Sequence, residues 1–234
     1  MDQKSVYSMA LNEKLPKIFS IHHNRPNTLT IDGGTASGKS TLSLAIKALY
    51  SHSWPRVQIV SIDWFMRPRR TRAPLYTKLE RSEIAVEDYH VNTWDLDRFD
   101  LIIAQLLAVL KSASYQTIVL DKLADRDSGE STRTLRLGLC RNTFLILEGT
   151  GVLHPDRQLL PGPRVWTEAP SLRDIIERKF CRNQLRDHTT TRLQVADRYL
   201  TTESMHDSWI SSLCKSRADW LYISNSSEIL TKRE

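Results

Sequence analysis

The sequence NTLTIDGGTASGKST, residues 27–41, indicates how the chain folds. Residues 27–32 are rich in apolar and β-branched side chains and predict a short buried strand. Residues 33–41 match G-x-x-x-x-G-K-[ST], the pattern of a phosphate-binding loop. A helix is expected next, because apolar residues recur at i, i+3, i+4 and i+7: Leu42, Ala45, Ile46 and Leu49. Strand, loop and helix in this order are the context that the motif requires.

The loop predicts a set of contacts with a nucleotide. Its glycines allow a tight turn that directs backbone N–H groups inward, at a helix N-terminus that favours anions. Lys39 adds a positive charge for the β- and γ-phosphates, and the Ser40 hydroxyl can hold Mg²⁺. The predicted nucleotide-binding residues are Gly33, Gly34, Thr35, Ala36, Ser37, Gly38, Lys39, Ser40 and Thr41.

The length and net charge of the chain indicate how many domains it has and what kind of ligand it binds. The chain has 234 residues, which suits one α/β domain with a lid or insertion. Its 33 Lys and Arg residues against 27 Asp and Glu residues give a net charge of +6. The basic residues cluster at 67–72 and 173–192, as in proteins that bind polyphosphates or nucleic acids. The sequence has no recognised nucleic-acid-binding motif, so we expect a bound nucleotide and no nucleic-acid partner.

Cysteine usage and hydropathy predict a soluble cytoplasmic protein without a membrane partner. The three cysteines are widely spaced and fit neither a metal site nor a disulfide framework. There is no apolar segment of signal-peptide or membrane-spanning length. We expect an N-terminal helical extension over residues 1–26 and a single nucleotide-binding domain over 27–234.

Strand and helix patterns alternate along the chain. Helices are expected from Asp97, from a cap at Ser171, and over about 192–216, whereas residues 64–88 predict an ordered loop. Further strands are expected at 57–62, 115–120, 143–147, 165–166 and 220–223. This alternation predicts three α/β/α layers around a parallel sheet, with functional sites at the carboxyl ends of the strands.

Two acidic residues directly follow predicted strands. Asp63 and Glu148 should therefore project from the same sheet edge as the phosphate-binding loop. Mg²⁺ prefers oxygen ligands and commonly takes one or two carboxylates, so Ser40, Asp63 and Glu148 form a predicted metal site. Asp63 is also the candidate for accepting a proton from an attacking hydroxyl.

Three arginines are predicted to lie on one stripe of the helix that begins at Ser171. Arg178, Arg182 and Arg186 follow at i, i+4 and i+8. Arginines that close over a nucleotide stabilise the charge that develops on the transferred phosphoryl group. We therefore expect a helical lid at about 178–198, although a solvated basic face is the ordinary alternative.

Taken together, these motifs resemble the uridine kinase and nicotinamide riboside kinase branch of the P-loop kinases. The resemblance covers about residues 27–225 and depends on the phosphate-binding loop, Ser61-Ile62-Asp63-Trp64-Phe65, Trp94-Asp95, Leu147-Glu148-Gly149, the arginine-bearing lid and Ala218-Asp219-Trp220. It implies the P-loop NTPase fold, ATP or GTP as donor, and Mg²⁺. It also implies that Asp63 lies beside the acceptor hydroxyl, that Glu148 helps hold Mg²⁺, and that Asp95 binds ribose hydroxyls. The lid arginines would contact the phosphates.

The acceptor is less well indicated. Uridine kinases usually carry aromatic and histidine residues that grip the pyrimidine, where this chain has residues 123–127, LADRD. A different acceptor pocket could be built from five other side chains, although the aromatic ones could equally belong to the core: Trp64, Arg67, Tyr89, His90 and Trp94.

The sequence therefore predicts a kinase that phosphorylates a small-molecule hydroxyl, most simply the 5′-hydroxyl of a nucleoside or nucleoside-like compound. A kinase of the same fold acting on pantothenate, a sugar phosphate, glycerate or an antibiotic is a second hypothesis, because fold does not determine the acceptor. A nucleotide-binding switch or nucleic-acid-associated ATPase is a third. Related kinases include monomers, dimers and tetramers, so the oligomeric state stays open, with a homo-oligomer among the alternatives.

Overall fold

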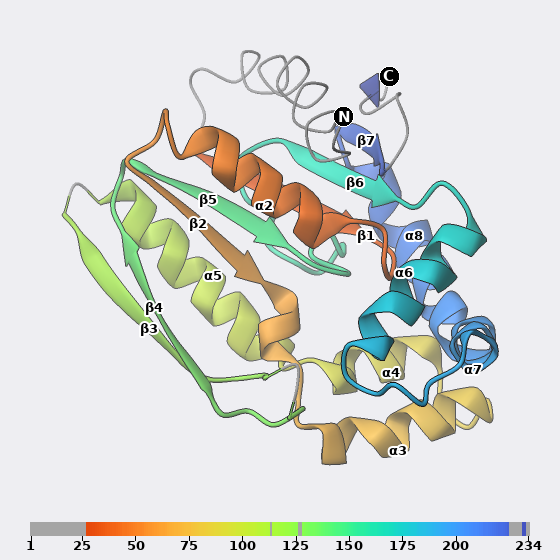
Figure 1. Cartoon of the computed structure of the whole chain (residues 1–234). Helices are drawn as coiled ribbons and strands as arrows, with labels where there is room; N and C mark the ends of the chain where they lie inside the picture. Colours follow the sequence, from red (N-terminus) through yellow and green to blue (C-terminus); the bar gives the residue numbers. More distant parts are fainter. Residues whose placement is uncertain (1–26, 113, 126–127, 225–230, 233–234) are drawn as a thin grey trace.

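The computed structural model describes residues 27–112, 114–125, 128–224 and 231–232. The extension expected over residues 1–26 lies outside these ranges. The central sheet has the strand order β2-β5-β1-β6-β7-β8 (Figure 1). Its strands are β1 (Thr28–Gly33), β2 (Arg56–Ser61), β5 (Thr143–Glu148), β6 (Arg164–Glu168), β7 (Trp220–Ile223) and β8 (Thr231–Lys232). β1, β2, β5, β6 and β7 are parallel, as expected, and β8 pairs antiparallel with β7.

The sheet is covered on both faces because successive residues of a strand point to opposite sides. In β5, Phe144 and Ile146 pack in the cluster with Leu42 and Ile46 of α2 (Lys39–Tyr50). Leu145 and Leu147 instead join the cluster that contains α5 (Leu96–Lys111). Helix α8 (Ser204–Cys214) packs against β6 on the same face of the sheet as α5. All six residues of β5 are buried, which explains the unbroken apolar run at residues 144–147.

A two-stranded antiparallel hairpin forms a separate sheet beside α5. Its strands are β3 (Gln116–Leu123) and β4 (Arg133–Leu139). Leu120, Leu123, Leu137 and Leu139 are buried in the same cluster as α5, so the hairpin covers the side of α5 that faces away from the central sheet (Figure 1).

The prediction of a loop over residues 64–88 was wrong. This segment contains the second half of a 3₁₀ turn, η1 (Ile62–Phe65), all of α3 (Arg69–Glu80), and the start of α4 (Val86–Thr93). Helix α3 buries only Leu79, so it has no apolar stripe from which a helical period could be recognised. Pro74 lies inside the helix, where proline is normally unfavourable.

The C-terminal helices largely agree with expectation. The Ser171 hydroxyl accepts a hydrogen bond from Asp174 N at 3.2 Å and caps α6 (Leu172–Gln184). The single helix expected over 192–216 is interrupted. It consists of α7 (Arg192–Arg198), a π-helical turn η2 (Tyr199–Glu203), α8, and a 3₁₀ turn η3 (Lys215–Arg217). Within the described ranges, no helix combines the length and apolar character needed to cross a bilayer.

Candidate phosphate-binding site

The loop between β1 and α2 has the backbone shape that its sequence predicts. Gly38 has φ 102° and immediately precedes α2, in a region of φ that other residues rarely adopt. Lys39 is buried, and its Nζ donates to Gly33 O at 2.9 Å and Gly34 O at 2.7 Å. The ammonium group therefore lies across the loop, where it could meet phosphate oxygens.

Ser40 and Glu148, both predicted metal ligands, are in direct contact. The Ser40 hydroxyl donates to Glu148 Oε2 at 3.2 Å, and Glu148 is only 4% exposed. Glu148 pairs with Ile31 of β1 on one side and with Ser61 of β2 on the other. Asp63 lies two residues beyond Ser61, so the loop, Glu148 and Asp63 follow one another along the same sheet edge, as expected.

These oxygen donors suit Mg²⁺ in its usual mode, in which phosphate oxygens and water complete the shell. Among the described residues, no group of three or more His, Cys, Asp or Glu could hold a metal ion. We expect Ser40, Asp63 and Glu148 to bind Mg²⁺ together with phosphate oxygens of a nucleotide. The metal-ligand roles of these residues stay predictions.

Asp207 of α8 is a contact of the loop that the sequence did not reveal. Its Oδ1 accepts from Thr35 N at 2.9 Å and from Thr35 Oγ1 at 3.0 Å, and its Oδ2 accepts from Tyr199 OH at 3.2 Å. A Cβ on Gly34 would lie 3.1 Å from Asp207 Cγ, so glycine at this position makes room for the carboxylate. Because 172 residues separate Thr35 from Asp207, no local pattern could indicate the pair.

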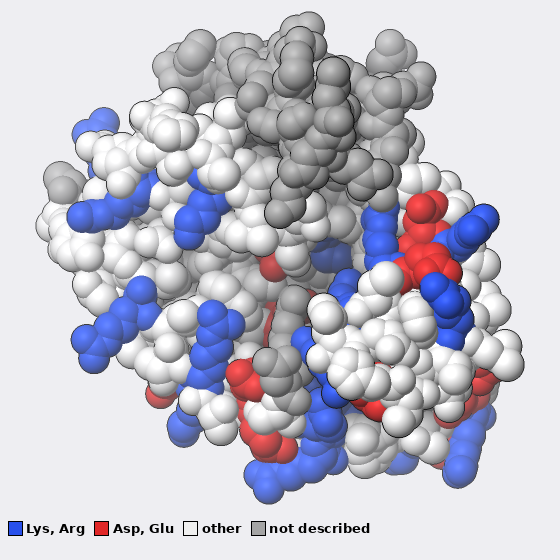
Figure 2. Space-filling view, viewed as in Figure 1, with Lys and Arg blue, Asp and Glu red and all other residues white. Residues whose placement is uncertain are grey.

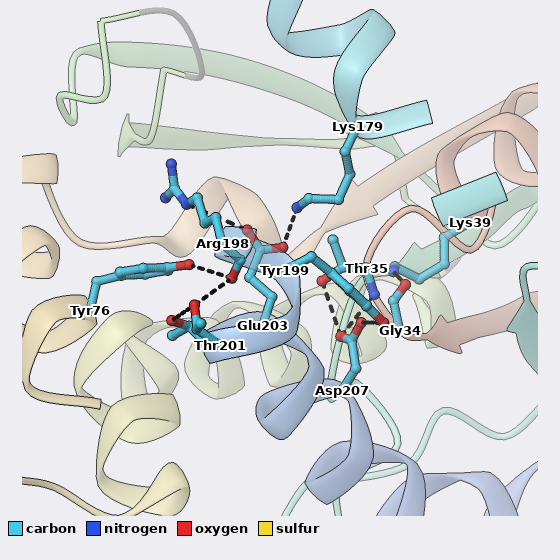
Figure 3. A network of polar contacts seen from close by, with 11 residues as sticks. Gly34, Thr35, Lys39, Tyr76, Lys179, Arg198, Tyr199, Thr201, Glu203 and Asp207 are labelled. Atoms are coloured by element: carbon cyan, nitrogen blue, oxygen red, sulfur yellow. Dashed lines mark hydrogen bonds and ion pairs between the residues drawn. The ribbon is translucent and has the colours of Figure 1, made fainter. Parts of the chain in front are cut away.

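A chain of polar contacts extends from this carboxylate to the predicted lid (Figure 3). Tyr199 and Glu203 both belong to the π-helical turn η2. Glu203 forms an ion pair with Lys179 of α6, and Arg198 Nε lies 3.7 Å from Glu203 Oε1. π-Helical turns are frequent at functional sites. Here the turn connects α6 and α7 to Asp207, and so to the phosphate-binding loop.

The three predicted lid arginines occupy different positions. Arg178 donates to Ala36 O at 2.9 Å and to Ser224 Oγ at 2.7 Å, so it contacts the loop directly. Arg182 is exposed on α6. The expected stripe does not reach Arg186, because α6 ends at Gln184 and Arg186 lies beyond it, also exposed. Phosphate contacts by these arginines stay predictions.

Three of the predicted acceptor residues lie in η1 or close to it. Asp95 precedes α5, and its N–H donates to Phe65 O at 2.8 Å, which brings residues 94–95 next to the turn that holds Asp63. Trp64 is half-buried, with the guanidinium of Arg133 5.5 Å from its ring centroid. Arg67 is exposed. Their roles toward an acceptor stay predictions.

The other predicted acceptor residues, Tyr89, His90 and Trp94, belong to an aromatic cluster between α4, α8 and the segment after β5. His90 Nδ1 lies 3.0 Å from His206 Nε2, and the ring centroids of Trp94 and His206 are 5.5 Å apart. His90 is 1% exposed and Trp94 is 4% exposed, whereas Tyr89 is half-buried. The cluster also includes His154 and Trp209. His90 and Trp94 therefore occupy buried positions, as the core alternative expects.

We expect this cluster to make the protein sensitive to mild acid. Burial lowers the pKa of His90 to about 3 and of His206 to about 4. The unfolded chain, with histidine pKa values of about 6.5, therefore binds more protons than the folded chain between about pH 6.5 and 4. The stabilisation is complete above about pH 6.5 and is lost as the pH falls through this range. Urea unfolding at several pH values should show it.

His206→Gln removes one of these titrating groups, and the loss of unfolding free energy between pH 7.5 and 5 should become smaller than in the natural chain. The matched control is His52→Gln, at an exposed position, which should leave the pH dependence unchanged. Equal pH dependence in all three proteins would contradict the expectation.

Asp32, which the sequence suggested only as a strand residue, is wholly buried at the base of the loop. Its carboxylate accepts hydrogen bonds from Gly33 N at 2.6 Å, Gly151 N at 2.9 Å and Leu153 N at 2.8 Å. Burial raises the pKa of Asp32, and these backbone donors oppose the rise. The carboxylate therefore ties the start of the loop to the segment that follows Glu148.

No protein-family model and no curated protein matches this sequence. Solved structures do match. A structure described as a possible uridine kinase from Bacillus stearothermophilus has a TM-score of 0.60 and 14% identity, covering 91% of this chain and 96% of that one. A putative fructose transport system kinase from Silicibacter sp. TM1040 has a TM-score of 0.59 and 19% identity, covering 88% and 95%. D-glycerate 3-kinase from Cryptococcus neoformans has a TM-score of 0.56 and 13% identity, covering 98% of each chain.

Together with the parallel sheet and the glycine-rich loop after β1, these similarities show that the chain has the α/β fold of P-loop kinases.

Proposed function

We propose that the protein is a nucleoside-triphosphate-dependent kinase that transfers the γ-phosphate to a hydroxyl group of a small molecule. The observation that carries this proposal is the contact between Ser40 of the phosphate-binding loop and Glu148, with Asp63 at the next strand tip. All three solved structures described above are named as kinases of small molecules, which supports the same class.

Each residue would have a distinct task in the transfer. The loop amides and Lys39 would hold the phosphates of ATP or GTP. Ser40 and Glu148, with Asp63, would hold Mg²⁺, which supplies charge neutralisation for the phosphate oxygens when it is bound. Arg178 contacts the loop carbonyl of Ala36 and could turn toward a phosphate.

In the chemical step, the acceptor oxygen would attack the γ-phosphorus while its proton passes to the Asp63 carboxylate. The bond from the γ-phosphorus to the oxygen that bridges it to the β-phosphate would break, and the nucleoside diphosphate would leave. Closure of α6 and α7 over the site would exclude water, and the contacts from Lys179 through η2 to Asp207 could couple that closure to the loop.

For the acceptor, we propose a small hydroxyl compound in the cytoplasm, with the 5′-hydroxyl of a nucleoside or nucleoside-like molecule as the first candidate. The order of the motifs supports this choice, as does the position of Asp95 beside η1. The structures named for fructose transport and D-glycerate keep sugars and sugar acids as the second candidate class.

Incubation with labelled ATP and a mixed library of hydroxyl-bearing metabolites, followed by mass identification of the product, would test the proposal. We expect one acceptor, or one family of acceptors, to gain a phosphate in a Mg²⁺-dependent reaction. Lys39→Ala should abolish the transfer, because it removes the charge that lies across the loop. Equal transfer by the natural protein and this variant would contradict the proposal.

A further inference from the structure

A group of arginines lies at the start of α3, on the side of the site beyond Asp63. The group consists of Arg67, Arg69, Arg70 and Arg72. Figure 2 shows Lys and Arg side chains, with Asp and Glu among them, over the lower part of the molecule, where Figure 1 places α3. Across the described part of the chain, none of these four guanidinium groups lies within ion-pair distance of a carboxylate.

Arg72 is the best-defined member of the group. Its side chain is half-buried, and its Nε donates to Arg67 O at 2.6 Å, which orients the guanidinium plane. Burial lowers the pKa of Arg72, and the nearby charges of Arg69 and Arg198 lower it further, whereas Tyr89 and Asp63 oppose the lowering. The guanidinium is therefore partly removed from water, near two other arginines and one acid.

Arg198 adds a positive charge from the predicted lid. Its guanidinium lies 4.5 Å from the ring centroid of Tyr76, a residue of α3. The Tyr76 hydroxyl donates to Arg198 O at 3.2 Å and so holds the end of α7 against α3 (Figure 3). Glu203 is 3.7 Å from Arg198, but the same carboxylate also pairs with Lys179.

The charges in this region are unbalanced. Among the described residues, the cations Arg69, Arg72, Arg198, Lys179 and Arg182 lie near the carboxylates of Asp63 and Glu203. Like charges that are partly removed from water repel each other, and the repulsion is relieved when an anion binds between them. A guanidinium group offers planar, paired N–H donors that match the oxygens of a carboxylate or phosphate.

The order of elements across the sheet edge indicates which anion would bind. The phosphate-binding loop follows β1, Glu148 ends β5, and Asp63 follows β2, and these three strands are neighbours. The donor phosphates already have Lys39 and the loop amides at the β1 end. The arginines at the start of α3 follow η1, the turn that holds Asp63, and the charge of Asp63 acts on Arg72, so they lie beside the proposed base, where the acceptor hydroxyl would be.

We propose that Arg69, Arg72 and Arg198 bind a phosphate or carboxylate group of the acceptor, so that the second candidate class, an anionic hydroxyl compound such as a sugar phosphate or a hydroxy acid, fits this site better than the neutral nucleoside named first. This inference rests on the proposed function, because it assigns the acceptor of the same site. It also gives the arginines at the start of α3 a function. Packing alone would not account for them, because Leu79 is the one residue that this helix buries.

Matched pairs of ligands that differ in one charged group would test the inference. The probes are ribose 5-phosphate with ribose, D-glycerate with glycerol, and inorganic phosphate as the minimal anion, each titrated calorimetrically into the full chain. We expect the charged member of a pair to bind at least about 10-fold more tightly. Arg72→Gln should weaken its binding by about 10- to 100-fold, because a charge-assisted hydrogen bond is lost. Arg72→Lys should recover part of the loss.

Arg70→Gln is the matched control, because Arg70 lies in the first turn of the same helix, is exposed, and is not among the charges that shift the pKa of Arg72. It should leave binding of all probes unchanged, and circular dichroism should show that every variant is folded. ADP and ATP should bind equally well to Arg72→Gln and to the natural chain.

Three results would overturn the inference: no charge preference within the pairs, no binding of any charged probe, or a loss in Arg72→Gln that affects ATP but not the charged probes. The last result would assign the arginines to the γ-phosphate. If the charged probes bind as expected but no phosphate is transferred to any acceptor, the anion site stands and the proposed kinase function fails.

Discussion

Asp63→Asn should lower kcat by roughly 100- to 10,000-fold, the usual contribution of a general base, while the Kd for the nucleotide changes little. Asparagine keeps the size and shape of the side chain but cannot accept the proton of an attacking hydroxyl. The backbone of this turn should be unaffected, because Asp63 N donates to Ser61 Oγ at 3.3 Å and that contact does not involve the carboxylate. The variant should therefore bind its ligands and fail in the chemical step.

Steady-state kinetics with the identified acceptor, together with calorimetric titration of ADP, would separate these effects. Asp97→Asn is the matched control, because Asp97 is an exposed acid in the first turn of α5. It should retain normal kcat. If Asp63→Asn kept most of its kcat, Asp63 would not be the base, and the assignment of the acceptor to this side of the sheet would lose its main support.

Local sequence patterns predicted the elements that form local or strongly apolar structure. The loop after β1, the buried strands β1 and β5, the long apolar helix α5 and the Ser171 cap all depend on residues close together in the sequence. Because parallel strands end at one sheet edge, their order also predicted that Glu148 would approach Ser40.

The prediction failed where a helix is stabilised without an apolar stripe, or where a contact joins distant residues. Helix α3 is mainly polar and contains Pro74, so its sequence indicated a loop. The π-helical turn η2 has no sequence signal that distinguishes it from the helices on either side. Asp207 reaches Thr35 across 172 residues. For the histidine and tryptophan at residues 89–94, the sequence left a ligand pocket and a core position as equal alternatives, and their partners on α8 bury His90 and Trp94 in a cluster.

Asp32 is a further residue whose importance depends on distant contacts, and its removal should cause the largest loss of stability. Its two carboxylate oxygens accept three backbone N–H groups, two of them from residues 119 and 121 positions away. Asp32→Ala would leave these three buried donors without an acceptor. Each unsatisfied buried donor costs about 1–3 kcal/mol, so we expect the free energy of unfolding to fall by at least about 3 kcal/mol.

Asp32→Asn distinguishes loss of hydrogen bonding from loss of volume. Its carbonyl oxygen can still accept from one or two of the donors, whereas its NH₂ group would oppose another, so its loss of stability should lie between those of the natural chain and Asp32→Ala. Denaturant unfolding would measure all three, with Asp97→Asn expected within about 0.5 kcal/mol of the natural chain as a surface control.

Because Gly151 and Leu153 follow Glu148 in the same segment, the Asp32 variants should also displace that acid from Ser40 and lower activity at subsaturating Mg²⁺. An alanine variant as stable as the natural chain would show that water or backbone rearrangement replaces the carboxylate, and that Asp32 does not hold the two halves of the site together.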